Sequence, residues 1–153
     1  MERILSGPAA PRLPPLPPPL PPPPDETAIR CALHGAWSRQ TAAQWLPENP
    51  ARGQCNVTAA VIFDLFGGQI LRTRLGDAWH YYNRFSDLRI DFTDSQFAAP
   101  GALFAPPIAY DDEVTTRAAA MAGVAEREHA VLRHALISAL GGPLDDPLAD
   151  PTA

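Results

Sequence analysis

Lysine is absent from this sequence: all 12 of its basic residues are arginines, and they are scattered along the chain. Seventeen acidic residues outweigh them, which gives a net charge of -5 and a pI near 5.2. Nucleic acids and anionic membranes recruit clustered basic side chains. The scattered arginines and the acidic balance therefore argue against a nucleic acid or a membrane as a partner.

Long apolar runs and cysteines are scarce as well. No run of 18 apolar residues occurs, and the first residues lack a basic segment followed by an uninterrupted apolar one. We therefore expect no membrane span and no secretion signal, and a cytoplasmic protein. The two cysteines, Cys31 and Cys55, are too sparse for a disulfide framework and are expected to be free thiols.

Proline is abundant, but most of it is concentrated near one end. Eleven of the 19 prolines fall between Pro8 and Pro24, where missing amide donors and a fixed φ exclude helices and central strands. We expect residues 1–24 to be a disordered proline-rich tail and residues 141–153 a second flexible tail. Residues 25–140 are then a single domain, with 46% apolar residues in the whole chain to supply its core.

The proline-rich tail also carries a short interaction pattern. Arg12, Pro15 and Pro18 have the spacing of a ligand for an SH3-like groove. A weak protein partner that binds this tail is one interpretation. The alternative is a solvated tail of biased composition.

Apolar spacing predicts three helices in the domain. The first begins at a cap, Asp25 or Thr27, and includes Cys31, which is expected to be a small core residue. The second extends from Cys55 to Phe66, where two glycines end it. The third is a long helix that begins at Asp111 or Asp112, bends at Gly123 and ends near Gly141. Their apolar stripes are Ile29, Leu33 and Trp37; Val57, Val61, Ile62 and Leu65; and Val114, Ala118, Met121, Ala125, Leu132 and Leu136.

Three short strands are predicted between the second and third helices. The segments Gln69–Thr73, Trp79–Phe85 and Leu88–Phe92 are separated by Gly-Asp and Ser-Asp turns. They are typical of an antiparallel meander. The predicted fold class is therefore α+β, with a helix packed on a small antiparallel sheet and a long C-terminal helix.

Cys55, His80 and Asp91 form a candidate catalytic set in this framework. Cysteine attacks as a thiolate, although a thiol ordinarily ionises near pH 8.5. The unpaired N–H groups and the dipole at the start of a helix stabilise such an anion, and Cys55 is predicted to stand there. An imidazole, as in His80, has a pKa suited to proton transfer at neutral pH.

The expected strand register brings the last two of these residues together. If Ser86 and Asp87 form a two-residue turn, Tyr82 lies opposite Asp91, one diagonal step from His80. Asp91 could then orient the imidazole. A one-residue shift of the register would remove the pairing.

Further residues are candidates for supporting roles. The Gln54 side chain is the nearest second donor to an oxyanion, beside the backbone N–H of Cys55. Asn83, on the opposite strand face, replaces Asp91 as the orienting residue only if a bulge intervenes, and Gln96 is a second supporting candidate. A metal site built from Cys55, His80 and Asp91 is an alternative, but no paired spacing such as CxxC occurs.

Structural roles would also explain the three residues. A cysteine at a helix start is often buried and inert, and a histidine between aromatic residues is often a hydrogen-bonded core residue. Asp91 could cap the turn at Thr93 to Ser95. The order of the three residues, together with their predicted elements, favours a joint site.

Four segments carry a resemblance to a known family: AWSRQTAAQW, NPARGQCNVTAAVIFDLFGG, HYYNRF and RIDFTDSQF. They resemble the YunG-like family of small bacterial proteins, whose members share NPxxGQCxVTA, DxFGG, HxxN, IDxT and QF elements. That pattern in turn resembles compact papain-like and transglutaminase-like cores. The resemblance implies such a core, with Cys55 as nucleophile, His80 as base and Asp91 as the orienting aspartate.

The expected function is acyl-group chemistry through a thioester on Cys55. Water as acceptor would make the protein an amidase or peptidase, and an amine would make it an acyltransferase. The substrate would be a small molecule or peptide, and no cofactor or metal is expected. The alternative is a noncatalytic binding or interaction module in which Cys55 and His80 are structural.

Overall fold

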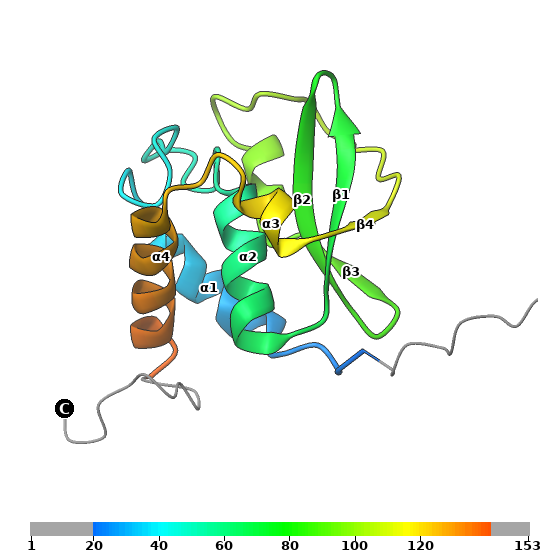
Figure 1. Ribbon diagram of the computed structural model, residues 1–153. Coiled ribbons are helices and arrows are strands. Elements are labelled where there is room, and N and C mark those ends of the chain that lie inside the picture. The colour runs from blue at the N-terminus through cyan, green and yellow to red at the C-terminus, as the bar shows by residue number, and fades with distance from the viewer. Residues whose placement is uncertain (1–19, 142–153) are drawn as a thin grey trace, which may run out of the picture.

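The computed structural model describes residues 20–141, which form helices packed on one side of an antiparallel sheet (Figure 1). The sheet has four strands in the order β3-β2-β1-β4. The predicted α+β class is confirmed. In chain order the elements are α1 (Glu26–Ala36), α2 (Cys55–Phe66), β1 (Gln69–Leu75), β2 (Ala78–Phe85), β3 (Leu88–Ile90), the 3₁₀ turn η2 (Asp94–Phe97), β4 (Glu113–Thr115), α3 (Arg117–Met121) and α4 (Glu126–Ala139).

The two predicted tails fall mostly outside the described residues, and so does the predicted ligand pattern at Arg12. The described part of the proline-rich segment, residues 20–24, lies against the turn between β2 and β3. There the Pro21 carbonyl oxygen accepts hydrogen bonds from the Ser86 backbone N–H at 3.1 Å and from its hydroxyl at 3.4 Å.

Helix α1 begins at the predicted cap, since the Asp25 carboxylate accepts from the Ala28 N–H at 3.1 Å. Ile29 and Leu33 are buried as predicted, but Cys31 is exposed, so the prediction that it lies in the core is wrong. Cys31 lies two residues after the buried Ile29 and two residues before the buried Leu33. At 3.6 residues per turn, that spacing places its side chain on the opposite side of the helix.

Helix α2 has the predicted bounds and is the innermost helix, packed against β2 (Figure 1). It ends where Gly67 adopts a φ of 79°, a conformation that favours glycine. One buried polar contact ties it to the end of α1: the Trp37 indole N–H donates to the Thr58 hydroxyl at 2.9 Å.

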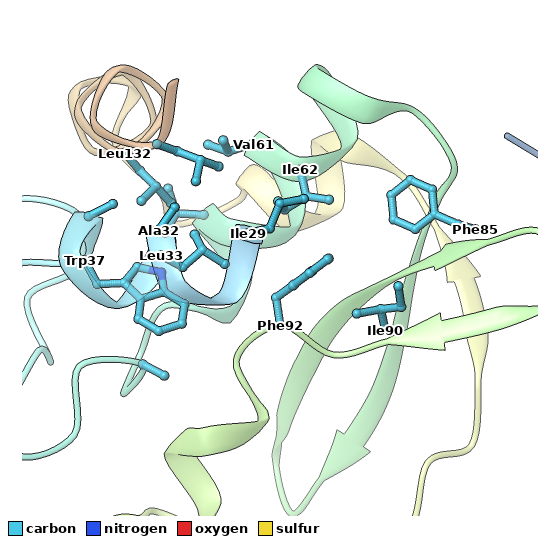
Figure 2. Close-up of a cluster of buried hydrophobic side chains, with 14 residues drawn as sticks. Ile29, Ala32, Leu33, Trp37, Val61, Ile62, Phe85, Ile90, Phe92 and Leu132 are labelled. Carbon is cyan, nitrogen blue, oxygen red and sulfur yellow. The ribbon is translucent and has the colours of Figure 1, made fainter. Parts of the chain in front are cut away.

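The main core lies between the three longer helices and the sheet (Figure 2). Figure 2 shows Ile29 and Leu33 of α1, Ile62 of α2 and Leu132 of α4 gathered on one side of it. Phe85 of β2 approaches from the opposite side. This core fixes α2 against the strands and therefore fixes where its first residue stands.

The predicted register between β2 and β3 is confirmed. Phe85 pairs with Leu88 and Asn83 with Ile90 across the Ser-Asp turn. Strand β3 ends at Ile90, two residues earlier than predicted, so Asp91 follows the strand directly.

The prediction of a single long C-terminal helix beginning at Asp111 or Asp112 is wrong for the first half of that segment. Glu113–Thr115 is instead strand β4, which pairs with β1 and leaves Val114 56% exposed. Thr115 and Thr116 are β-branched and favour an extended chain. Thr116 then caps the short helix α3, and Gly123, with a φ of 88°, separates α3 from α4.

The contact between Trp37 and Thr58 supplies a test of how α1 and α2 are joined. The change Thr58→Val keeps the side-chain shape but leaves the buried indole N–H without its acceptor. We expect a loss of about 1 to 3 kcal/mol in the free energy of unfolding, measured by urea denaturation. The control Thr27→Val, at an exposed position of α1, should change it by less than about 0.5 kcal/mol. Equal effects of the two changes would contradict the assigned contact.

Candidate functional site

Cys55 is the first residue of α2, as predicted, and its side chain is half-buried. No side chain caps this helix start, so the first-turn N–H groups have no acceptor from a capping residue. The thiol lies 3.3 Å from Oδ1 of Asn56, which accepts its hydrogen bond. The Nδ2 group of Asn56 donates to the Ala120 carbonyl oxygen at 3.1 Å and so ties the helix start to α3.

The loop before α2 is held in a narrow conformation that delivers Cys55. Gly53 has a φ of 75°, and a Cβ there would lie 2.7 Å from that of Gln44, so no other residue fits without a shift. Arg52 donates to the Gln44 carbonyl oxygen at 3.0 Å and to that of Gly101 at 3.1 Å. These contacts fix the direction from which the chain enters the helix.

His80 and Asp91 form a buried pair. His80 on β2 is 3% exposed and Asp91 is 6% exposed. Nε2 of the imidazole lies 2.6 Å from Oδ2 of the carboxylate. The predicted neighbourhood of these two residues is therefore present.

Asp91 accepts hydrogen bonds at both carboxylate oxygens. Besides His80, Oδ2 accepts from the Tyr110 hydroxyl at 2.7 Å. Oδ1 accepts from the Thr93 backbone N–H at 3.1 Å and from the Thr93 hydroxyl at 3.2 Å. The Gln96 amide extends this network, since it donates to the Thr93 hydroxyl at 3.0 Å.

The surroundings of the pair favour its charged form. Burial alone lowers the pKa of His80, but hydrogen bonds to Asp91 and Cys55 outweigh it and raise that pKa to about 10. Burial likewise opposes the charge on Asp91, yet the hydrogen bond and charge of His80 hold the pKa of this carboxyl below its usual value. Both shifts favour an imidazolium and a carboxylate at neutral pH. Because Nε2 is hydrogen-bonded to Asp91, Nδ1 is the ring nitrogen that is available to exchange a proton with the thiol of Cys55.

Cys55 and His80 line the same pocket, which has a volume of about 280 Å³. It lies between the start of α2, the tip of the β1–β2 hairpin and the segment around η2 and the loop after it. The lining side chains include Gln96, one of the predicted supporting residues. The structure therefore brings together Cys55, His80, Asp91 and Gln96.

Two predicted supporting residues lie elsewhere. The Gln54 side chain is fully buried, where its Oε1 accepts from the Thr41 hydroxyl at 2.8 Å and its Nε2 lies 3.4 Å from the Ser38 carbonyl oxygen. Gln54 therefore holds the loop in place and does not face the pocket.

Asn83 donates to the Ala59 carbonyl oxygen at 3.1 Å and ties β2 to α2. No bulge brings it to His80.

The sequence reasoning missed Tyr110, whereas the turn at Thr93 that Asp91 caps was one of its interpretations. Thr93 has a local signal, because an Asp whose carboxylate accepts from the N–H two residues later is a common turn. Tyr110 has none, since it lies 19 residues from Asp91 in an irregular loop.

Residues 20–141 contain neither a metal site nor a membrane-spanning helix. No group of three or more His, Cys, Asp or Glu side chains there is arranged to hold a metal ion. In the same part of the chain, none of the helices has both the length and the apolar character needed to cross a membrane.

Comparisons with known proteins place the chain in a family. A family model described as YunG protein matches residues 25–141. The chain belongs to the YunG family. It is 38% identical over 107 residues to the uncharacterized protein YunG of Bacillus subtilis (strain 168), which covers 70% of this chain and 87% of that protein. No solved structure shows a significant match. The matched range, residues 25–141, spans the positions of Cys55, His80 and Asp91.

The buried pair in this YunG-family chain predicts a particular dependence of stability on pH. The raised pKa of His80 gives stabilisation that is complete below about pH 6.5 and is lost as pH rises toward about 10. The lowered pKa of Asp91 gives stabilisation that is present above about pH 4 and is lost in acid. The change Asp91→Asn should therefore lower the free energy of unfolding most near pH 6, by about 3 to 5 kcal/mol, and by less at pH 9. Urea denaturation at both pH values measures this, and an equal cost would contradict the charged pair.

Proposed function

We propose that this protein is a cysteine-dependent acyl-group enzyme. Cys55 is the nucleophile, His80 transfers protons, and Asp91 orients His80 and stabilises its charge. The observation that carries the proposal is the convergence, at one pocket, of a thiol at an uncapped helix start and an imidazole paired with a buried carboxylate.

The first step follows from the charges at the site. An imidazolium beside Cys55 stabilises the thiolate that attacks a carbonyl carbon. The Sγ–C bond forms, the bond from carbon to the leaving group breaks, and the leaving group departs with the electron pair and takes a proton from His80. The product of this step is a thioester on Cys55.

The second step releases the acyl group. Water or an amine attacks the thioester carbon and gives a proton to His80, and the thiolate of Cys55 leaves. Water yields a carboxylic acid, as in an amidase or peptidase, and an amine yields a new amide, as in an acyltransferase. The first-turn N–H groups of α2 are available as donors to the oxyanion, because intrahelical acceptors are lacking there.

The energetics of the pair support a functional rather than a structural role. A buried ion pair seldom stabilises a fold more than apolar residues of the same size would, because both charges lose their hydration. Here four donors surround Asp91, and the imidazole faces an open pocket rather than a sealed core. Such an arrangement is typical of groups whose protonation matters for chemistry.

The order of the site residues supports a finer proposal about the fold. A cysteine on a helix, followed by a histidine on a strand and an aspartate after the next strand, matches papain-like and transglutaminase-like cores. We infer that the helix α2 and the hairpin of β2 and β3 are a compact version of such a core. The reactivity of the thiol tests the activation of Cys55 that such a core would provide.

Cys31 provides an internal reference for that test, because it is exposed while Cys55 is half-buried. Accessibility alone would make Cys31 react faster. If His80 activates Cys55, iodoacetamide should alkylate Cys55 at least about tenfold faster than Cys31 at pH 6, where an ordinary thiol is almost fully protonated. Site-resolved mass spectrometry over time measures both rates in one sample.

The matched variants are His80→Gln and Cys31→Ser. His80→Gln should remove the advantage of Cys55 at pH 6, whereas Cys31→Ser should leave its rate unchanged. Thermal unfolding of each variant shows whether the fold is retained. A folded His80→Gln protein in which Cys55 reacts as before would contradict the assignment of His80 as the residue that activates Cys55. It would favour a noncatalytic binding module.

A further inference from the structure

The wall of the Cys55 pocket combines several large apolar side chains with polar groups, in nearly equal parts of its surface, and it carries little charge. Apart from Cys55 and His80 it has no ionisable side chain, and its other polar side chains are the neutral amides of Gln44, Asn56 and Gln96. The large apolar side chains that line it are Leu75, Trp79, Phe97, Leu103 and Phe104.

Trp79 is a braced part of this wall. Its indole ring is flanked by the guanidinium carbons of Arg72, at 3.9 Å from the ring centroid, and of Arg74, at 4.4 Å. Arg72 is held in turn by Glu113 of β4, whose Oε2 accepts from Nε of Arg72 at 3.2 Å and from its Nη2 at 2.7 Å. Neither arginine lines the pocket, so the brace adds rigidity without adding a charge to the wall.

The loop between η2 and β4 supplies the outer part of the wall. It passes the tip of the β1–β2 hairpin (Figure 1), where a Cβ on Gly76 would be in van der Waals contact with the Phe104 ring, at 3.4 Å. The next residue toward the N-terminus, Leu103, lines the pocket and is nevertheless 51% exposed. An apolar group bound beside Cys55 would cover it.

We propose that the Cys55 pocket takes an uncharged apolar acyl group, aromatic or short aliphatic, from an ester, thioester or amide. This inference rests on the proposed acyl chemistry and names its substrate class. A charged acyl group would lose its hydration against a wall that offers no counter-charge except the imidazolium engaged with Asp91 and Cys55. The volume, about 280 Å³, equals that of roughly nine water molecules at about 30 Å³ each. It therefore suits a single ring or a short chain.

A series of p-nitrophenyl esters tests the acyl preference directly. Attack by Sγ forms the thioester, breaks the bond from the carbonyl carbon to the phenolic oxygen and releases p-nitrophenolate with the electron pair, which is read by its absorbance. The acyl groups are acetyl, hexanoyl, phenylacetyl and the anionic hemisuccinyl. Each acylation rate constant is divided by that of the same ester with N-acetylcysteine, which removes intrinsic reactivity.

The inference predicts normalised rate constants at least about tenfold higher for phenylacetyl and hexanoyl than for acetyl, and lower ones for hemisuccinyl. Leu103→Ser should reduce the advantage of phenylacetyl severalfold. The matched control is Leu88→Ser, because Leu88 is 53% exposed on β3 and does not line the pocket. It should leave the preference unchanged.

The outcomes separate the two proposals. Acylation of Cys55 at equal normalised rates by all four esters, or equal effects of Leu103→Ser and Leu88→Ser, would overturn the apolar preference while the acyl chemistry stands. No acylation by any ester, together with ordinary reactivity of Cys55 toward iodoacetamide, would overturn the proposed function and this inference with it.

Discussion

A buried imidazolium is stable in this protein because Asp91 accepts its Nε2 proton at 2.6 Å, and because the carboxylate is itself fixed by Thr93 and Tyr110. Taken alone, each charge would be costly away from water. The ion pair and three further donors satisfy the carboxylate, and the Nε2 contact holds the ring in one orientation. The strand register, the turn after β3 and the loop that carries Tyr110 all contribute groups to this one interaction.

The other half of the site depends on the helices. The core between α1, α2 and α4 fixes α2 against β2, while Gly53 and Arg52 shape the loop that enters it. Gln54 secures the same loop from inside through Thr41. Cys55 is therefore positioned by α2 and the loop before it. Helix α1 links this half of the site to the other, because Arg30 donates to the backbone carbonyl oxygen of Asp91 at 3.2 Å.

Local signals in the sequence predicted much of this arrangement. Apolar spacing and two glycines predicted both ends of α2, and the Ser-Asp turn predicted the register that places Asp91 near His80. The role of Gln54 was not found this way, because a helix-start position does not show where a long side chain turns.

Features that depend on distant contacts were not predictable from local patterns. Strand β4 forms because Glu113–Thr115 pairs with β1, more than 35 residues away, and apolar spacing alone made it look helical. Tyr110 reaches Asp91 only through the path of an irregular loop. Cys31, by contrast, was predictable: its spacing from the buried Ile29 and Leu33 places it on the exposed side of the helix, and its residue type alone suggested the core.

The charge state of His80 is the central claim, and nitrogen NMR of the histidine ring measures it most directly. In protein labelled with ¹⁵N-histidine, the His80 signals are identified by their loss in His80→Gln. At pH 8, well above the ordinary histidine pKa of about 6.5, we expect both ring nitrogens of His80 to carry protons, because its pKa is raised to about 10. A neutral ring at pH 8, with one nitrogen unprotonated, would contradict it.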